Sequence, residues 1–265
     1  MTIKRTFKEA VKARMMETRE PYMLARKFVI EHGGGKHPGI FIGVNETGKR
    51  IYWNPQETPH LLVGGQPGSG KTFFLKYLID QKKKSDALIA FIDLKKRQTP
   101  LIEDIWRSAQ DISSAKTIIL EAWEIMETRY QLMQTMVVNN YKHLPDAPAI
   151  FVVIDEFNSN LIEENLNQDS KDISIEKALQ KVLMLGRAAG VHIVIAIQDT
   201  KVVPDSLNVH IDARLALGNM NSKLYDLITY LEPTEVPLVT EKRFREGTLR
   251  VGTLIEKIII PDIVL

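Results

Sequence analysis

The chain contains 265 residues, of which 44% are hydrophobic and 26% are charged, and its formal net charge is +2. It has no cysteine, which excludes a disulfide framework, a thiolate metal site and a cysteine nucleophile. No apolar run is as long as a bilayer span and the amino terminus is charged, so we expect a cytoplasmic globular protein that a membrane-bound partner could recruit.

The amino-terminal segment, residues 1–39, is basic, with nine Lys and Arg against four Glu in residues 1–36. Its apolar spacing predicts a helix over residues 5–31, which the glycines at 33–35 end. Two interpretations stay open. The segment is either an arm that binds a phosphate backbone or an amphipathic helix that docks on the body or on a neighbouring subunit.

The remainder, residues 40–265, is expected to form one α/β domain. A β-hairpin is predicted for residues 40–44 and 50–53, and another for residues 248–252 and 255–260. Between them, predicted strands and helices alternate, which indicates a mostly parallel sheet flanked by helices. The strands are expected at 61–64, 87–93, 150–155, 191–197 and 213–218, and the helices at 71–83, 113–138 and 174–189.

The strongest motif follows the first of these strands and completes the pattern G-x-x-x-x-G-K-[ST], a phosphate-binding loop. Its backbone N–H groups and the start of the next helix are expected to surround the phosphates of ATP. Lys71 would reach the β- and γ-phosphates, and the Thr72 hydroxyl would hold Mg²⁺. The loop consists of Gly65, Gln66, Pro67, Gly68, Ser69, Gly70, Lys71 and Thr72.

A second motif is the apolar run 149–154, which ends in Asp155 and Glu156. In a Walker B strand, Asp155 would hold Mg²⁺ directly or through water, and Glu156 would act as the general base. A strand that merely ends in acidic loop residues is the alternative. The phosphate-binding loop upstream favours the functional interpretation.

The positions of two further polar residues relative to the predicted strands make them candidates for the site. Gln198 ends the strand after Walker B, where it could hydrogen-bond the γ-phosphate or the attacking water. Arg187 lies near the end of the helix before that strand, where it could complete the ATP site of a neighbouring subunit. It could equally be a cation that the helix dipole favours, and spacing alone leaves this open.

Further segments in a fixed order accompany these motifs: Thr58–Gly65, Ile92–Lys95, Met126–Met133, Val153–Phe157, Gly186–Gly190, His192, Ala196–Gln198 and Asp212–Ala216. Together they resemble the FtsK/SpoIIIE family of ring-forming DNA-pumping ATPases, over about residues 40–255. Leu94 stands where the family pattern has proline. No membrane helix, long linker or carboxyl-terminal winged-helix module is visible, which favours a compact member over a chromosome pump.

The resemblance implies a RecA-like motor core, a hexameric ring with ATP between subunits, and ATP-driven movement of double-stranded DNA. It favours Arg187 as the arginine supplied in trans and suggests Arg214 as a second residue near the subunit boundary. Compact members serve conjugative transfer or replication of plasmids, phages and integrative elements. The implied partners therefore include a membrane channel or a relaxosome or replication protein.

Two other functions are alternatives to a DNA motor. One is a type VII secretion-like ATPase, which would move polypeptides. A DNA motor would instead contact DNA through basic residues, and the candidates are Lys95, Lys96, Arg97 and the amino-terminal arm. A non-enzymatic nucleotide-binding scaffold is disfavoured because the expected ATPase residues are all present: Lys71, Thr72, Asp155, Glu156 and Gln198.

Overall fold

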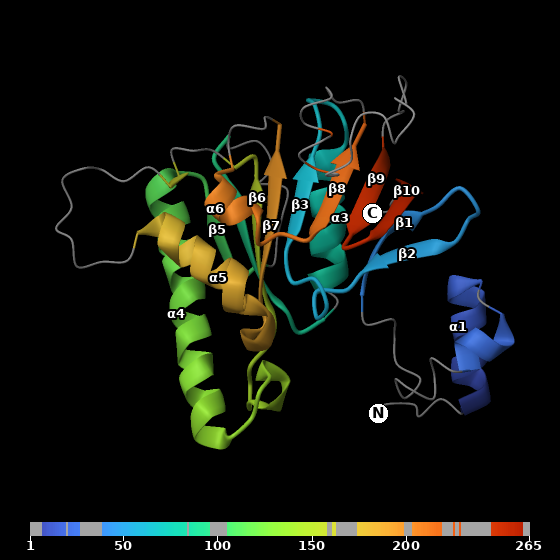
Figure 1. The fold of residues 1–265 in the computed structure, drawn as a ribbon, viewed down its shortest axis with the longest axis horizontal. Coiled ribbons are helices and arrows are strands. Elements are labelled where there is room, and N and C mark those ends of the chain that lie inside the picture. Colours follow the sequence, from blue (N-terminus) through green and yellow to red (C-terminus); the bar gives the residue numbers. More distant parts are fainter. Residues whose placement is uncertain are drawn as a thin grey trace.

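Figure 1 shows the fold in the computed structural model of the chain. The description covers residues 7–19, 21–26, 39–83, 85–95, 105–157, 161–162, 174–198, 203–218, 225, 228 and 245–261.

A sheet of ten strands in the order β2-β1-β10-β9-β8-β3-β7-β6-β4-β5 organises the described part of the molecule. The strands from β8 to β5 are parallel, whereas β9, β10, β1 and β2 pair antiparallel and extend one side. The strands are β1 Ile40–Val44, β2 Arg50–Trp53, β3 Leu61–Gly64, β4 Leu88–Asp93, β5 Arg107–Ala109, β6 Ile150–Asp155, β7 Val191–Ile197, β8 Ala213–Leu217, β9 Glu246–Val251 and β10 Leu254–Ile259.

Helices cover both faces of the parallel strands (Figure 1). One core packs α4 and α5 against one face, and the other packs α3 against the opposite face. Alternate residues of β7 serve the two cores, with Ile195 in the first and Val194 in the second. The helices are α1 Phe7–Thr18, α3 Lys71–Lys83, α4 Ile112–Met136, the 3₁₀ turn η2 Tyr141–His143, α5 Ile175–Ala189 and α6 Asp205–Asn208.

Local signals explain where the two long helices begin and end. The Asp111 side chain accepts the backbone N–H of Ser114 and caps the start of α4, and Ser174 caps α5 in the same way. The helix α5 ends at Gly190, whose φ of 71° is readily adopted by glycine. The strands β6, β7 and β8 are buried along their whole length, as expected for parallel strands with helices on both faces.

The α/β fold and both hairpins predicted from the sequence are confirmed, and the predicted strands and helices match the observed ones within a few residues. Two expectations were wrong. The predicted amino-terminal helix is interrupted, because α1 ends at Thr18, Arg19 has a φ of 55° and Pro21 precedes a short helical stretch at 22–26. The short parallel edge strand β5 was not predicted at all.

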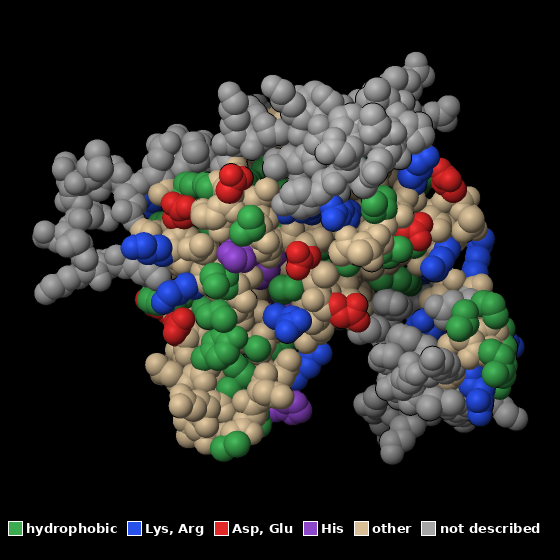
Figure 2. All heavy atoms as spheres, viewed as in Figure 1, with side chains coloured by type: hydrophobic (Ala, Val, Ile, Leu, Met, Phe, Trp, Pro, Cys, Tyr) green, Lys and Arg blue, Asp and Glu red, His purple; other side chains and the backbone are tan. Residues whose placement is uncertain are grey.

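Exposed apolar side chains lie on the outer helices. Figure 2 shows hydrophobic side chains gathered over α5, where Met184 and Leu185 are exposed, and Leu132 is exposed on the neighbouring α4. Within the described ranges, no helix is long and apolar enough to cross a membrane.

Candidate active site

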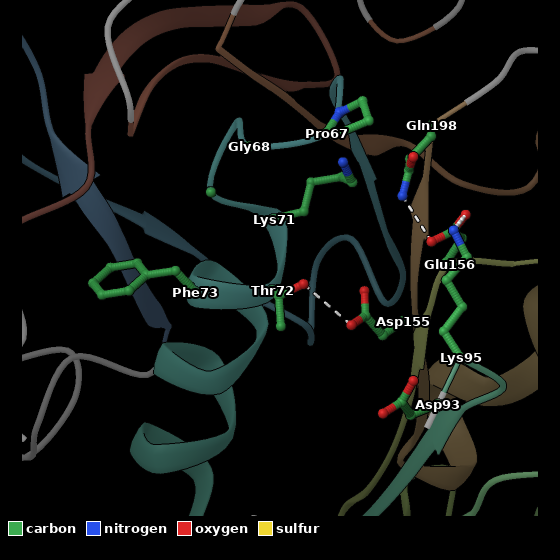
Figure 3. Close-up of a pocket in the computed structure, with 11 residues that line it drawn as sticks. Pro67, Gly68, Lys71, Thr72, Phe73, Asp93, Lys95, Asp155, Glu156 and Gln198 are labelled. Carbon is green, nitrogen blue, oxygen red and sulfur yellow. Dashed lines mark hydrogen bonds and ion pairs between the residues drawn. The ribbon is translucent and has the colours of Figure 1, made fainter. Parts of the chain in front are cut away.

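Sheet register brings the predicted site residues to one edge, at the carboxyl ends of the central parallel strands. Gly64 of β3 is paired with Ile197 of β7, and Asp93 of β4 is paired with Asp155 of β6. These strand ends surround a cavity of about 300 Å³ (Figure 3). The residues that line it are Pro67, Gly68, Gly70, Lys71, Thr72, Phe73, Asp93, Lys95, Asp155, Glu156 and Gln198.

The loop between β3 and α3 has the conformation that phosphate binding requires. Gly68 and Gly70 have φ values of 79° and 98°, a region that side chains other than glycine rarely adopt. Lys71 is 6% exposed, and its Nζ donates to the carbonyl oxygens of Gly65 at 2.6 Å and Gln66 at 3.0 Å. Burial lowers the pKa of Lys71 to about 8, although the carboxylates of Asp155 and Glu156 oppose the decrease.

Hard oxygen donors lie beside this loop. The Thr72 hydroxyl donates to Oδ2 of Asp155 at 3.2 Å, and the buried Asp93 lies next to Asp155 in the sheet. Burial raises the pKa of Asp155, and the nearby charge of Asp93 adds to the increase. A divalent cation would relieve this repulsion, and a hydroxyl with carboxylates matches the donors that Mg²⁺ prefers.

These donors are too few to hold a metal ion alone. In the part of the chain that the structure describes, no group of three or more His, Asp or Glu side chains is arranged to hold one. This fits Mg²⁺, which is usually bound by one or two carboxylates together with water and the phosphates of a nucleotide.

Glu156 sits at the end of β6 with its carboxylate held by two side chains. Gln198 donates Nε2 to Oε2 of Glu156 at 2.7 Å, and Lys95 forms an ion pair with Oε1 (Figure 3). The backbone of Glu156 has a φ of 66°, an unusual conformation for a residue other than glycine and one that clusters at functional sites. The carboxylate lies next to Gln198 and Lys95 at the rim of the cavity (Figure 3).

The two arginines lie away from this cavity. Arg187 is exposed in the last turn of α5, and that helix leads into the amino end of β7, opposite the edge that carries the phosphate-binding loop. Arg214 differs from expectation, because it is 1% exposed and donates to the side chain and the carbonyl oxygen of Asn208. A guanidinium buried within its own chain cannot reach a neighbouring subunit, so Arg214 is not a boundary residue.

Sequence reasoning missed two charged residues of the cavity. Lys95 was expected to contact DNA, but it lines the same cavity as the phosphate-binding loop and pairs with Glu156. Asp93 had no assigned role and lies beside Asp155. Asp93 ends a buried strand and Lys95 comes two residues after it, a signal close to the one that identified Gln198. The other proposed contacts, Lys96 and Arg97, lie outside the described residues.

The chain matches the family model described as AAA domain over residues 56–199. It is similar to curated bacterial proteins that are longer than itself. It is 27% identical over 221 residues to the FtsK domain-containing protein YdcQ of Bacillus subtilis, covering 80% of this chain and 44% of that protein. It is 25% identical over 235 residues to the DNA translocase FtsK of Bacillus cereus, covering 75% of this chain and 28% of that one.

Solved structures share the fold. The pCW3 conjugation coupling protein TcpA, in its monomer form with ATPγS, superposes with a TM-score of 0.70 at 19% identity over 85% of this chain and 66% of that one. The cytoplasmic domain of the type VII secretion ATPase EccC from Thermomonospora curvata gives 0.66 at 18% identity over 85% of this chain and 29% of that one. The expected RecA-like fold and the resemblance to FtsK proteins are confirmed.

Proposed function

This chain belongs to the AAA domain family and is an ATPase, and from that premise we propose that it is a motor that moves double-stranded DNA. We propose further that it works as a ring, with six subunits the expected number, in conjugative transfer or replication of a plasmid, phage or integrative element. Residues 1–39 would form an accessory basic segment and residues 40–265 the motor.

One observation carries the proposal of DNA as the substrate. The relatives to which the chain is similar over about three quarters of its length include proteins named DNA translocase FtsK. The chain spans less than half the length of the curated relatives it matches, so the substrates of those whole proteins come to this chain as a proposal.

The geometry of the cavity supports a division of labour among its residues. Lys71 would exchange the carbonyl oxygens of Gly65 and Gln66 for the β- and γ-phosphates of ATP. Thr72 and Asp155 would hold Mg²⁺, which when bound neutralises charge on the phosphates.

Glu156 would act as the general base. Its carboxylate accepts a proton from a water molecule as the water oxygen attacks the γ-phosphorus, and the bond to the bridging oxygen of ADP breaks. Gln198 already donates to this carboxylate and would orient it or the water. The products are ADP and inorganic phosphate.

A ring would bring a second chain to the site. Arg187 is exposed beside Met184 and Leu185 on α5, a mixture of cation and apolar surface suited to a subunit boundary. We propose that it stabilises transition-state charge in the neighbouring subunit's site. DNA would be held by basic side chains of the amino-terminal segment, among them Lys12 and Arg26, which are exposed. A membrane channel, a relaxosome protein or a replication protein would be the partner that recruits the motor.

The second candidate is an ATPase that moves polypeptides in type VII secretion. The fold likeness to EccC, with a TM-score of 0.66, favours it nearly as much as the likeness to TcpA favours a conjugation motor. The identities of 18% and 19% leave the fold unable to distinguish the two, and the similarity to FtsK sequences supports DNA as the substrate.

The test is steady-state ATP hydrolysis with Mg²⁺, with and without long double-stranded DNA, at low and moderate salt. We expect strong stimulation by DNA that weakens as salt rises, because phosphate contacts release counterions. Lys71→Ala should abolish turnover in every condition. Turnover that depends on Lys71 and is indifferent to DNA would move the assignment to polypeptide transport.

A further inference from the structure

Lys95 is a charged residue that lines the cavity and has no role in the proposed binding and hydrolysis of ATP. It lies in the turn that follows Asp93 at the end of β4, and its ammonium pairs with the carboxylate of Glu156. Lys95 lines the same cavity as the phosphate-binding loop (Figure 3). Burial lowers the pKa of Lys71, and the positive charge of Lys95 adds to that decrease, which places the two ammonium groups in one electrostatic environment.

The charges that line the cavity suit ATP only when Lys95 takes part. Among the described residues that line the cavity, the carboxylates of Asp93, Asp155 and Glu156 face the ammonium groups of Lys71 and Lys95. MgATP brings a further net negative charge, of which the γ-phosphate carries the largest share. Lys71 is shared between the β- and γ-phosphates, so Lys95 is the other cation among the described cavity residues that can balance charge on the γ-phosphate.

The ion pair between Lys95 and Glu156 can be exchanged for a contact with a ligand. The Lys95 side chain is 45% exposed and that of Glu156 is 24% exposed, and ion pairs in such partly solvated positions contribute little to stability. A lysine has a flexible four-carbon stem that can turn its ammonium from one acceptor to another. A phosphate oxygen carries more charge than one carboxylate oxygen and forms a stronger charge-assisted hydrogen bond.

We propose that Lys95 is a γ-phosphate ligand that leaves Glu156 when ATP binds. The transfer would pair the lysine with the third phosphate and release the Glu156 carboxylate to accept a proton from water. ADP has no γ-phosphate, so in the ADP state Lys95 would remain on Glu156. Lys95 would therefore distinguish ATP from ADP and make the base available in the ATP state. The inference rests on the proposed nucleotide site but not on the DNA substrate.

The experiment measures equilibrium binding of ATPγS and of ADP, each with Mg²⁺, to the full chain and its variants. For Lys95→Ala we expect ATPγS to bind about ten- to a hundredfold more weakly, the value of a hydrogen bond to a charged group, while ADP affinity changes less than about twofold. In turnover, KM for ATP should rise and kcat should fall together. Lys95→Arg should recover most of the ATPγS affinity.

Lys257→Ala is the matched control. Lys257 is 46% exposed and pairs with Glu46 at 3.6 Å, so it is an equally exposed lysine with a glutamate partner, but it lies on β10 away from the cavity. We expect this variant to bind both nucleotides as the unchanged chain does. Thermal melting of both variants checks that the fold is retained.

Glu156→Gln sharpens the test, because it removes the charge that competes with the phosphate for Lys95. It should strengthen ATPγS binding relative to ADP when Lys95 is present and leave the ratio unchanged in the Lys95→Ala background. The proposal is overturned if Lys95→Ala weakens ATPγS and ADP equally. Faster turnover at unchanged ATPγS affinity would also overturn it, since Lys95 would then only restrain Glu156. Failure of the unchanged chain to bind ADP would contradict the nucleotide site itself.

Discussion

The two ends of the parallel strands hold their polar side chains in different ways. At the amino ends, buried groups are fixed by backbone atoms, as where Arg129 donates to the carbonyl oxygens of Ala189 and Pro148, both at 2.7 Å. At the carboxyl ends, Glu156 is held by the side chains of Gln198 and Lys95. The carbonyl groups that Arg129 contacts lie away from the cavity and meet no ligand, whereas Glu156, Gln198 and Lys95 line the cavity, where a nucleotide can replace one partner by another. The first edge therefore serves stability and the second serves chemistry.

The largest expected effect tests the chemical edge. Glu156→Gln should keep ATP binding, because the amide retains the size of the side chain. It should lower kcat by about 10²–10⁴-fold, because an amide accepts no proton from water. Single-turnover hydrolysis beside equilibrium nucleotide binding measures both effects. An unchanged kcat would refute the assignment of Glu156 as the base.

The variant Arg187→Ala tests whether Arg187, which is exposed and far from the cavity of its own chain, contributes to ATP hydrolysis in the site of a neighbouring subunit. Turnover of the assembled ring should fall by about 10²–10³-fold, the cost of removing one group that stabilises transition-state charge. Nucleotide binding by single chains should be unaffected. Mixing Arg187→Ala with Lys71→Ala protein should restore partial activity if mixed rings form, because some sites then combine an intact loop with an intact arginine. Mixed rings without any activity would argue against action in trans.

Arg129→Ala tests the structural edge. We expect the free energy of unfolding to fall by about 2–4 kcal/mol, since two buried carbonyl groups lose a charged donor. The matched control is Arg107→Ala on the surface, where an exposed pair with Glu121 should be worth less than about 1 kcal/mol. Urea denaturation measures both variants. If Arg129→Ala and Arg107→Ala lowered the free energy of unfolding by the same amount, the buried contacts of Arg129 would not be stronger than an exposed ion pair.

A last test of the amino ends is the pH dependence of stability. Burial lowers the pKa of His60 and of His192 to about 3, well below 6.5 in the unfolded chain, so protons bind the unfolded state first. Stability should be full above pH 6.5 and should fall as pH decreases from there toward 3. Each histidine contributes about 1.4 kcal/mol per pH unit well below 6.5.

Denaturation between pH 7.5 and 5 gives this slope. His192→Asn should flatten the curve, because asparagine can still donate to the carbonyl of Pro59, which the His192 ring contacts at 3.0 Å, but does not titrate. A curve with the same slope in this variant would contradict the assignment of the proton uptake to His192.

Much of the fold and part of the site could be predicted because they depend on local sequence. Long buried strands can be predicted from apolar runs in the sequence, and Asp155 stands at the end of one of them. The edge strand β5 could not be predicted in this way, since its residues Arg107 and Ser108 are exposed and only Ala109 is buried. Pro21 lies within the predicted amino-terminal helix, and because proline breaks helices it precedes a separate short helical stretch at 22–26.

The positions of the Lys95 and Arg214 side chains could not be predicted from the sequence. The place of Lys95 follows from the register that pairs Asp93 with Asp155, which brings the turn after β4 to Glu156. The burial of Arg214 follows from its contact with Asn208 in α6. The contact of Lys95 joins distant segments of the chain, and that of Arg214 joins residues six positions apart. Neither can be read from the pattern of apolar residues. A charged residue after a strand can face a ligand, a partner or its own core.

The most direct test of the central claim is movement along DNA. A short strand bound as a triplex at one end of a long duplex is displaced when a motor arrives, and its release can be followed in time. We predict release that requires ATP hydrolysis, that is delayed as the duplex is lengthened, and that is lost in Lys71→Ala and Glu156→Gln. ATP hydrolysis in the presence of the duplex without any release of the third strand would contradict the claim that this ATPase moves double-stranded DNA.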